Sequence, residues 1–122
     1  MFIPQHFEVT DREEILSFIK ANSFGQLISS IEGRIFSSHI PFFLGNEGQT
    51  IICHIAKRNP QWEDIEDQEV LATFQGPHDY IYPSWYSCPA VPTWNYQAVH
   101  VYGKPRLITE IEKLKSIVND LT

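Results

Sequence analysis

Residues 24–44, FGQLISSIEGRIFSSHIPFFL, contain two runs rich in β-branched and aromatic residues, and a Glu-Gly pair separates them. Each run has the length and composition of a β-strand. Glu32-Gly33 has the chemistry of a hairpin turn, because glycine readily adopts the positive φ angle that such a turn requires. This stretch therefore predicts two antiparallel strands joined by a tight turn.

Three further strands are predicted after this hairpin. Asn46-Glu47-Gly48 marks a turn, and the strands that follow are TIICHIA at 50–56, EVLATFQ at 69–75 and a long run from Trp94 to Ile108. Short connections favour antiparallel pairing, so we expect a mainly β fold with flanking helices (α+β) that forms a small barrel. A chain of 122 residues suffices for one core, so residues 1–122 are expected to form a single domain.

Helices are predicted at three places outside these strands. Thr10 to Glu13 forms a capping box before an apolar stripe, and Thr109 to Glu112 forms a second one near the C-terminus. A brief helix is expected from Pro60 to about Glu66. The last helix has one apolar face that needs a partner, which could be the barrel, a second chain or a segment outside this sequence; it consists of Ile111, Leu114, Val118 and Leu121.

Composition excludes several classes of protein. The formal net charge of −6 disfavours binding nucleic acid by charge alone. The aromatic segment 80–103 contains no Lys, Arg, Asp or Glu, but its prolines and polar residues argue against a membrane span. The N-terminus lacks the pattern of a signal peptide, and Cys53 and Cys88 form no CxxC pair. We therefore expect a cytoplasmic protein with reduced thiols and no membrane contact.

The polar residues give little support for catalysis or for a metal site. None of the five histidines sits at a recognised ligand spacing, so no bound metal is expected. Ser38 and His39 are neighbours in a predicted strand, so their side chains point to opposite faces and cannot form a Ser-His pair. The sequence assigns no catalytic residue, and we lean against an enzyme.

The segment HIAKRNPQW, residues 54–62, predicts a phosphate site. Lys57 and Arg58 precede the expected helix at Pro60, and cations beside a helix N-terminus are typical of phosphate binding. The alternative is a solvated turn with Trp62 as a core anchor, and from spacing alone this alternative is the more common outcome. The uncharged aromatic segment could hold a planar ring. A phosphate and a flat ring together suggest FMN.

Four motifs in this order closely resemble the PaiB-like FMN-binding negative transcriptional regulators: SSHIPFFL, HIAKRNPQW, FQGPHDYIYPSWY and VPTWNYQAVHVYGKPRLI. Members of this family are bacterial proteins associated with repression of protease synthesis and sporulation genes. The resemblance covers nearly the whole chain. It implies a split β-barrel of the FMN-binding type, related to flavin-dependent pyridoxamine-phosphate oxidases, with FMN bound at the interface of a homodimer.

The resemblance also implies which residues contact FMN. Four residues would border the flavin: Ser37, Ser38, His39 and Pro41. Three would lie near the phosphate: Lys57, Arg58 and Asn59. Four would form an aromatic wall: Trp85, Tyr86, Trp94 and Asn95.

Two features depart from the family pattern. Members run on past this length with a further barrel portion, so the chain is expected to lack the C-terminal part of the family. FMN remains the expected cofactor, and the short length of the chain leaves open whether binding is complete, weak or lost. Tyr82 also replaces a small hydroxyl residue in YIYPSWY, which would reshape the pocket.

Three functions therefore compete. The first is an FMN-binding regulatory protein, a homodimer that represses protease-synthesis and sporulation genes and acts on DNA directly or through another protein. The second is a flavin-dependent oxidoreductase of the pyridoxamine-phosphate-oxidase-like class. The third is a dimerisation module that binds no flavin.

Overall fold

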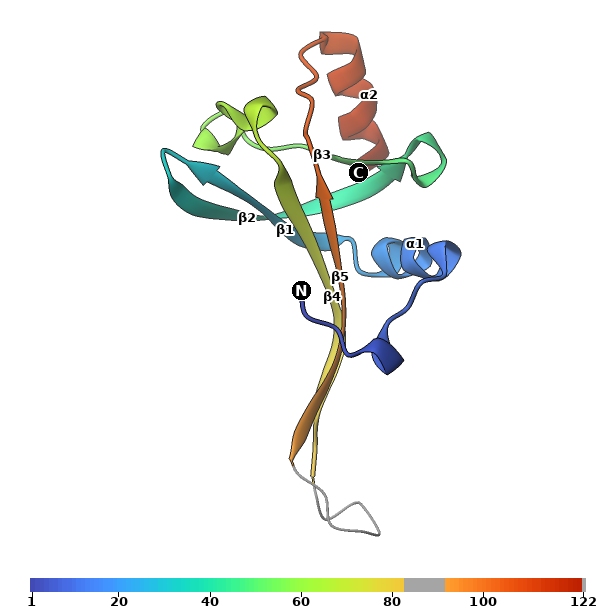
Figure 1. Cartoon of the computed structure of the whole chain (residues 1–122). Helices are drawn as coiled ribbons and strands as arrows, with labels where there is room; N and C mark the ends of the chain where they lie inside the picture. The colour runs from blue at the N-terminus through green and yellow to red at the C-terminus, as the bar shows by residue number, and fades with distance from the viewer. Residues whose placement is uncertain (83–91, 122) are drawn as a thin grey trace.

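A computed structural model describes residues 1–82 and 92–121, the last two of these for their backbone alone. Five strands form one antiparallel sheet in the order β3-β2-β1-β4-β5 (Figure 1). The strands are β1 (Phe24–Ile31), β2 (Arg34–Gly45), β3 (Thr50–Cys53), β4 (Val70–Ile81) and β5 (Thr93–Gly103). The helices are α1 (Arg12–Ala21) and α2 (Ile111–Leu121), with the short 3-10 turns η1 (Gln5–Phe7), η2 (Asn46–Gly48), η3 (Pro60–Trp62) and η4 (Ile65–Asp67).

This arrangement confirms the predicted fold class, which was mainly β with flanking helices. The sheet agrees with the split-barrel type, but in the described part of the chain it is open, with β3 and β5 at its two edges. Among the described residues, no helix is both long enough and apolar enough to cross a membrane.

The hairpin at residues 24–44 forms as predicted. β1 and β2 pair from Phe24↔Pro41 to Ile31↔Arg34. Glu32 and Gly33 occupy the turn with φ angles of 50° and 79°. Two positive φ angles are the geometry of a turn whose twist matches that of the flanking strands.

Three predicted strand boundaries were wrong. β3 ends at Cys53, so His54 lies beyond the strand rather than within it. β4 extends to Ile81, because it continues to pair with β5 beyond an irregularity between Gln75 and His78. β5 ends at Gly103, shortly before Pro105, which has no N–H to donate to a sheet.

Both predicted capping boxes were wrong by one residue. Asp11, not Thr10, caps α1, and its side chain accepts a 3.0 Å hydrogen bond from the Glu13 amide. Aspartate is the stronger N-cap of the two, since its carboxylate also complements the helix dipole. At α2 the Leu114 amide donates to the Glu110 carbonyl at 3.0 Å, so Glu110 takes the place expected for Thr109.

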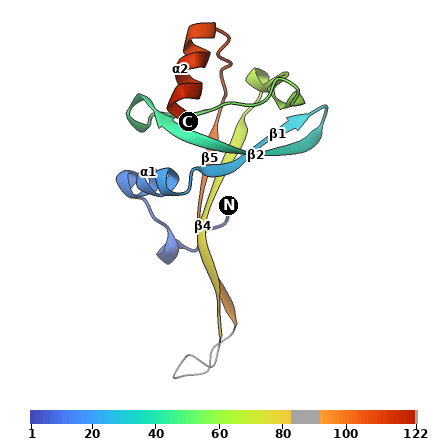
Figure 2. The same cartoon turned by 180° about the vertical axis from the view of Figure 1, so that it is seen from behind.

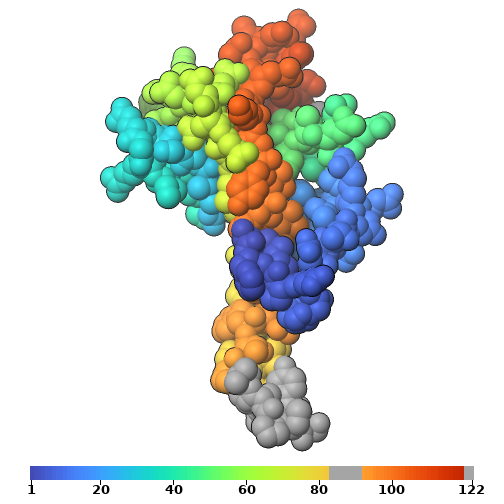
Figure 3. Space-filling model, in the orientation of Figure 1, coloured from blue at the N-terminus to red at the C-terminus, as the bar shows by residue number. Residues whose placement is uncertain are grey.

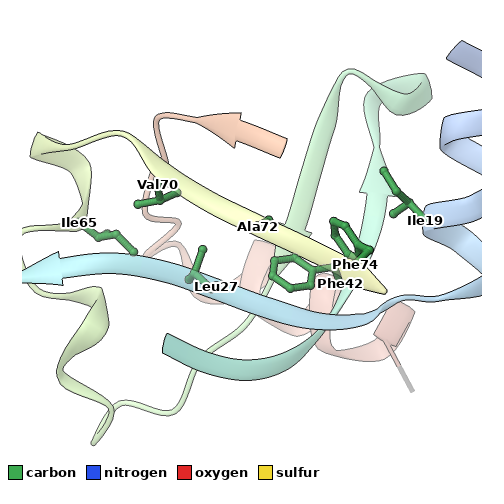
Figure 4. Packing of buried hydrophobic residues seen from close by; sticks show 7 residues of the cluster. All are labelled: Ile19, Leu27, Phe42, Ile65, Val70, Ala72 and Phe74. Atoms are coloured by element: carbon green, nitrogen blue, oxygen red, sulfur yellow. The ribbon is translucent and has the colours of Figure 1, made fainter. Parts of the chain in front are cut away.

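One face of the sheet carries the core. Alternate residues of β1, β2 and β4 bury their side chains there, together with one residue each from α1 and η4 (Figure 4). The buried residues are Ile19, Leu27, Phe42, Ile65, Val70, Ala72 and Phe74. Phe42 and Phe74 meet edge to face with ring centroids 5.1 Å apart. We call this side of the sheet the packed face.

The other side of the sheet, which we call the open face, leaves large apolar side chains exposed. Ile35 is 80% exposed, Phe24 66% and Tyr102 56%. The whole chain exposes 9557 Å², against about 6700 Å² for a compact monomer of this mass. The fold therefore presents more surface than a chain of this size normally leaves to solvent.

β4 and β5 continue past the other strands as a two-stranded arm, which Figures 1 and 2 show projecting from the sheet. The space-filling view in Figure 3 shows the N-terminal residues against the base of this arm. Trp94 and Tyr96 lie on the arm and are more than half exposed. The arm thus extends the exposed aromatic surface beyond the sheet.

The last helix also leaves an apolar face exposed. Ile111 is 69% exposed, Val118 43% and Leu114 39%, and these residues line a shallow groove on α2. The sequence predicted both this helix and its apolar face. The side chain of Leu121, the fourth residue expected there, lies outside the described part.

Candidate functional site

A row of four polar residues crosses the open face. The strand register places His39 opposite Gln26, Gln26 opposite Thr73, and Thr73 opposite His100. Residues paired across antiparallel strands share a face, so the four side chains lie on one line over β2, β1, β4 and β5. Strand spacing gives the row a length of about 14 Å. We call it the polar row.

A hollow of about 390 Å³ lies at one end of the polar row. Its lining contains no Lys, Arg, Asp or Glu side chain, and it consists of Met1, Thr73, Phe74, Gln75, His78, Trp94, Tyr96, Ala98 and His100. Small-molecule sites commonly have this size and combine apolar walls with a few polar groups. The hollow and the polar row share Thr73 and His100, so they form one continuous surface.

His100 is the titratable group at this junction. Burial lowers its pKa below 6.5, and the positive N-terminal ammonium lowers it further. The imidazole is therefore neutral at physiological pH. Its Nδ1 is buried and has no hydrogen-bond partner among the described residues. A buried polar atom of this kind normally has a partner, so this position has unused capacity for a hydrogen bond.

The indole of Trp94 is held in place on the arm. Its Nε1–H donates a 3.0 Å hydrogen bond to His78 Nδ1, and the two rings stack with centroids 5.6 Å apart. Tyr80 approaches the same indole at 5.8 Å. Because its edge is occupied and it is 56% exposed, Trp94 offers a fixed aromatic surface at the mouth of the hollow.

Lys57 and Arg58 lie in a tight turn at 56–59, which we call the cation turn. The Asn59 amide closes the turn on the Ala56 carbonyl at 2.9 Å, and Trp62 Nε1 donates to the Lys57 carbonyl at 2.8 Å. Both cationic side chains are exposed. Within the described residues neither makes an ion pair, although the chain as a whole is acidic. The turn therefore presents two free positive charges.

The predicted helix from Pro60 to Glu66 was wrong. The segment contains two separate three-residue turns, η3 and η4, and Asp64 between them has a left-handed φ of 57°. One turn of 3-10 helix has no substantial dipole, and the Asn59 side chain already accepts from the Gln61 amide at 3.0 Å. Only the side-chain charges of the cation turn remain to support a phosphate site.

The four residues expected to border the flavin fall on different faces of the sheet. Ser37, His39 and Pro41 belong to the open face by strand alternation. Ser38 belongs to the packed face, where its Oγ accepts a 2.8 Å hydrogen bond from Asn59 Nδ2. The structure thus places Ser38 with the cation turn and separates it from its two neighbours.

The predicted aromatic wall is described only in part. Trp94 lines the hollow, whereas Asn95 pairs with Asp79 and so points to the other side of the arm. Trp85 and Tyr86 lie outside the described residues, as does Cys88.

Residues that the sequence did not single out complete the surface. Gln26, Thr73 and His100 join His39 in the polar row, and Gln61 lies behind the cation turn. The sequence signal for these residues is the alternation of side chains between the two faces of each strand. This signal identifies a shared surface only when the register between strands is known, and the fold supplies that register.

The described residues hold no cluster of three His, Cys, Asp or Glu suited to a metal ion. Cys53 packs against the core, and burial raises the pKa of its thiol to about 11. The thiol is therefore protonated at physiological pH and a poor nucleophile.

Comparison with known proteins gives consistent matches. Residues 1–122 match the family described as "Putative FMN-binding domain". The chain is 46% identical to the Protease synthase and sporulation protein PAI 2 of Bacillus subtilis over 115 residues, which are 92% of this chain and 56% of that protein. It is 33% identical to an uncharacterized protein of Saccharomyces cerevisiae, covering 90% of this chain and 80% of that protein. The chain thus spans little more than half the length of the Bacillus relative.

Proposed function

The chain belongs to the "Putative FMN-binding domain" family, and we propose that it is an FMN-binding regulatory protein. The match confirms the resemblance found in the sequence and supports FMN as the cofactor. When bound, FMN supplies redox chemistry through its ring system.

We propose that the regulation is negative and is directed at protease-synthesis and sporulation genes. The name of the Bacillus relative mentions protease synthase and sporulation, and its 46% identity to this chain supports a shared role. The net charge of −6 disfavours direct contact with DNA phosphates. We therefore assign the DNA contact to another protein partner in the cytoplasm.

The polar row and the hollow are the proposed site of the flavin ring, and this continuous surface is the observation that carries the proposal. A flavin has apolar faces and an edge of carbonyl and nitrogen groups. Trp94 offers a stacking surface, while Gln26, Thr73 and His100 offer donors and acceptors. His100, whose imidazole is neutral at physiological pH, lines the hollow beside this edge.

The cation turn is the proposed site of the phosphate, and it implies a second copy of the chain. The ring site lies on the open face, whereas Asn59 holds the cation turn against Ser38 on the packed face. These positions are on opposite sides of one sheet. We propose a homodimer in which FMN contacts the open face of one copy and the cation turn of its partner. The large exposed surface of the single chain supports such pairing.

A titration with FMN tests this function. The purified protein is stripped of small molecules and titrated while flavin fluorescence and visible absorption are recorded. We expect saturable binding of one FMN per chain with a shifted flavin spectrum. An unchanged flavin spectrum at saturating protein would reject the FMN-binding role and leave the flavin-free dimerisation module.

A further inference from the structure

Gln61 is a buried polar residue directly behind the cation turn. Its side chain is 1% exposed, and its Nε2 donates to the Leu27 carbonyl at 2.8 Å and to Ser29 Oγ at 2.9 Å. Its Oε1 is buried without a hydrogen-bond partner among the described residues, so the bonds of Nε2 hold the side chain in one position. The residue thereby attaches the loop after β3 to the middle of β1.

Gln68 attaches the far end of the same loop in a similar way. Its side-chain amide accepts from the Ser30 amide at 2.7 Å and donates to the Ser30 carbonyl at 2.8 Å. Two glutamines therefore fasten residues 59–68 to one strand. They differ in their distance along the chain from the cation turn.

Gln61 is linked to the cation turn through short contacts. The backbone amide of Gln61 donates to Asn59 Oδ1 at 3.0 Å, and Asn59 Nδ2 in turn donates to Ser38 Oγ at 2.8 Å. The next residue, Trp62, holds the Lys57 carbonyl at 2.8 Å. The Asn59 side chain is thus committed to two contacts within the protein.

We propose that Gln61 is a positioning residue for FMN phosphate recognition. It does not touch the cofactor, but it fixes the turn from which Lys57 and Arg58 reach the phosphate. A turn that is already ordered loses less conformational freedom when the anion binds, so binding is tighter. The proposal rests on the proposed function, because it requires the cation turn to hold the phosphate of FMN.

The test compares FMN with riboflavin, which lacks the phosphate. Gln61→Met keeps the length of the side chain but removes the hydrogen bonds of Nε2 to Leu27, Ser29 and Phe36. We expect the variant to bind FMN about tenfold more weakly and riboflavin less than about twofold more weakly. Gln68→Met is the matched control, since it loses two bonds to the same strand away from the turn. It should lower the unfolding midpoint without changing the ratio of the two affinities.

Two outcomes would overturn the inference. One is an equal loss of FMN and riboflavin affinity in Gln61→Met, and the other is the same change of ratio in Gln68→Met. If Gln61→Met does not fold, Trp62→Phe decides, because it keeps an aromatic ring at this position but removes the indole N–H that holds the Lys57 carbonyl. Trp62→Phe should shift the ratio in the same direction, and an unchanged ratio would reject the proposal.

Failure of the proposed function has a different signature. If Lys57→Ala alters the FMN-to-riboflavin ratio while Gln61→Met and Trp62→Phe do not, the phosphate contact stands and the positioning role is wrong. If the wild-type protein binds FMN no better than riboflavin, the phosphate contact itself is wrong, and the positioning role falls with it.

Discussion

Asn59 Nδ2 donates a 2.8 Å hydrogen bond to Ser38 Oγ, which lies 21 positions earlier in the chain. This contact joins two motifs that had been identified separately, SSHIPFFL and HIAKRNPQW. It also separates Ser38 from Ser37 and His39, whose side chains lie on the open face. The cation turn and the polar row therefore flank the same strand from opposite sides.

Lys57→Ala tests the phosphate role of the cation turn. Lys57 is exposed, and we expect its loss to weaken FMN binding by roughly 1–3 kcal/mol, the scale of a charge-assisted hydrogen bond. Riboflavin binding should change far less. Stability should hardly change, because an exposed lysine without an ion pair contributes little. Parallel fluorescence titrations with the two ligands provide the measurement.

Lys20→Ala is the control for this experiment, because it removes the same charge from an exposed position on α1. Asp11→Ala would be a poor control, since Asp11 caps that helix. Equal FMN affinity in the wild type and in Lys57→Ala would reject the phosphate assignment.

Asp11→Ala should itself destabilise the fold by about 1 kcal/mol, through the lost hydrogen bond to the Glu13 amide. Thr10→Ala should leave the free energy of unfolding nearly unchanged. Urea denaturation of the two variants measures both quantities. A larger loss in Thr10→Ala would mean that Thr10 caps the helix, as the sequence first indicated.

The sequence predicted the hairpin well because its signals are local. The turn chemistry of Glu32-Gly33 and the runs beside it depend on neighbouring residues alone. The polar row could not be predicted in the same way. His39 and His100 look like isolated strand histidines until the register places Gln26 and Thr73 between them. Register depends on contacts between distant segments.

The prediction of a helix after Pro60 was wrong for a related reason. Proline after asparagine marks the start of a helical turn, and η3 does begin there. The turn does not continue into an α-helix. Asp64 has a left-handed backbone conformation, and the side chains of Gln61 and Gln68 form hydrogen bonds with β1. Contacts with another element of the fold therefore determine the conformation of this segment.

Gly25→Ala should destabilise the sheet. A Cβ added there would clash with the Thr73 carbonyl oxygen and lie 3.1 Å from the Phe74 ring, so the backbone of β1 or β4 must shift. We expect a loss of roughly 1–3 kcal/mol, the usual cost of overpacking. Gly103→Ala is the control, because an added Cβ there meets nothing within 4 Å. Equal unfolding midpoints for the two variants would contradict the close approach of β1 and β4.

His100 should make stability depend on pH. Its pKa is lowered in the folded protein, so below the unfolded pKa of about 6.5 the unfolded chain binds the proton more readily. This contribution to stability is therefore complete above about pH 6.5 and is lost as the pH falls through the lower, folded pKa. His100→Gln should show a smaller drop in melting temperature between about pH 7.5 and pH 5.5 than the wild type. His6→Gln, which replaces an exposed histidine in η1, serves as the control.

Phe24→Lys tests whether the open face joins two copies of the chain. Phe24 is 66% exposed and its ring stacks near that of His39 at 6.4 Å, so the isolated chain should tolerate the change within about 0.5 kcal/mol. In a dimer that buries this face, the lysine would lose its hydration without gaining a partner. Sedimentation in the micromolar range should therefore show a dimer for the wild type and a monomer for the variant, and FMN affinity should fall with the dimer. Phe7→Lys, which replaces a ring that is 69% exposed in η1, should remain dimeric. A wild-type monomer, or a Phe24→Lys dimer with full FMN affinity, would refute the shared site.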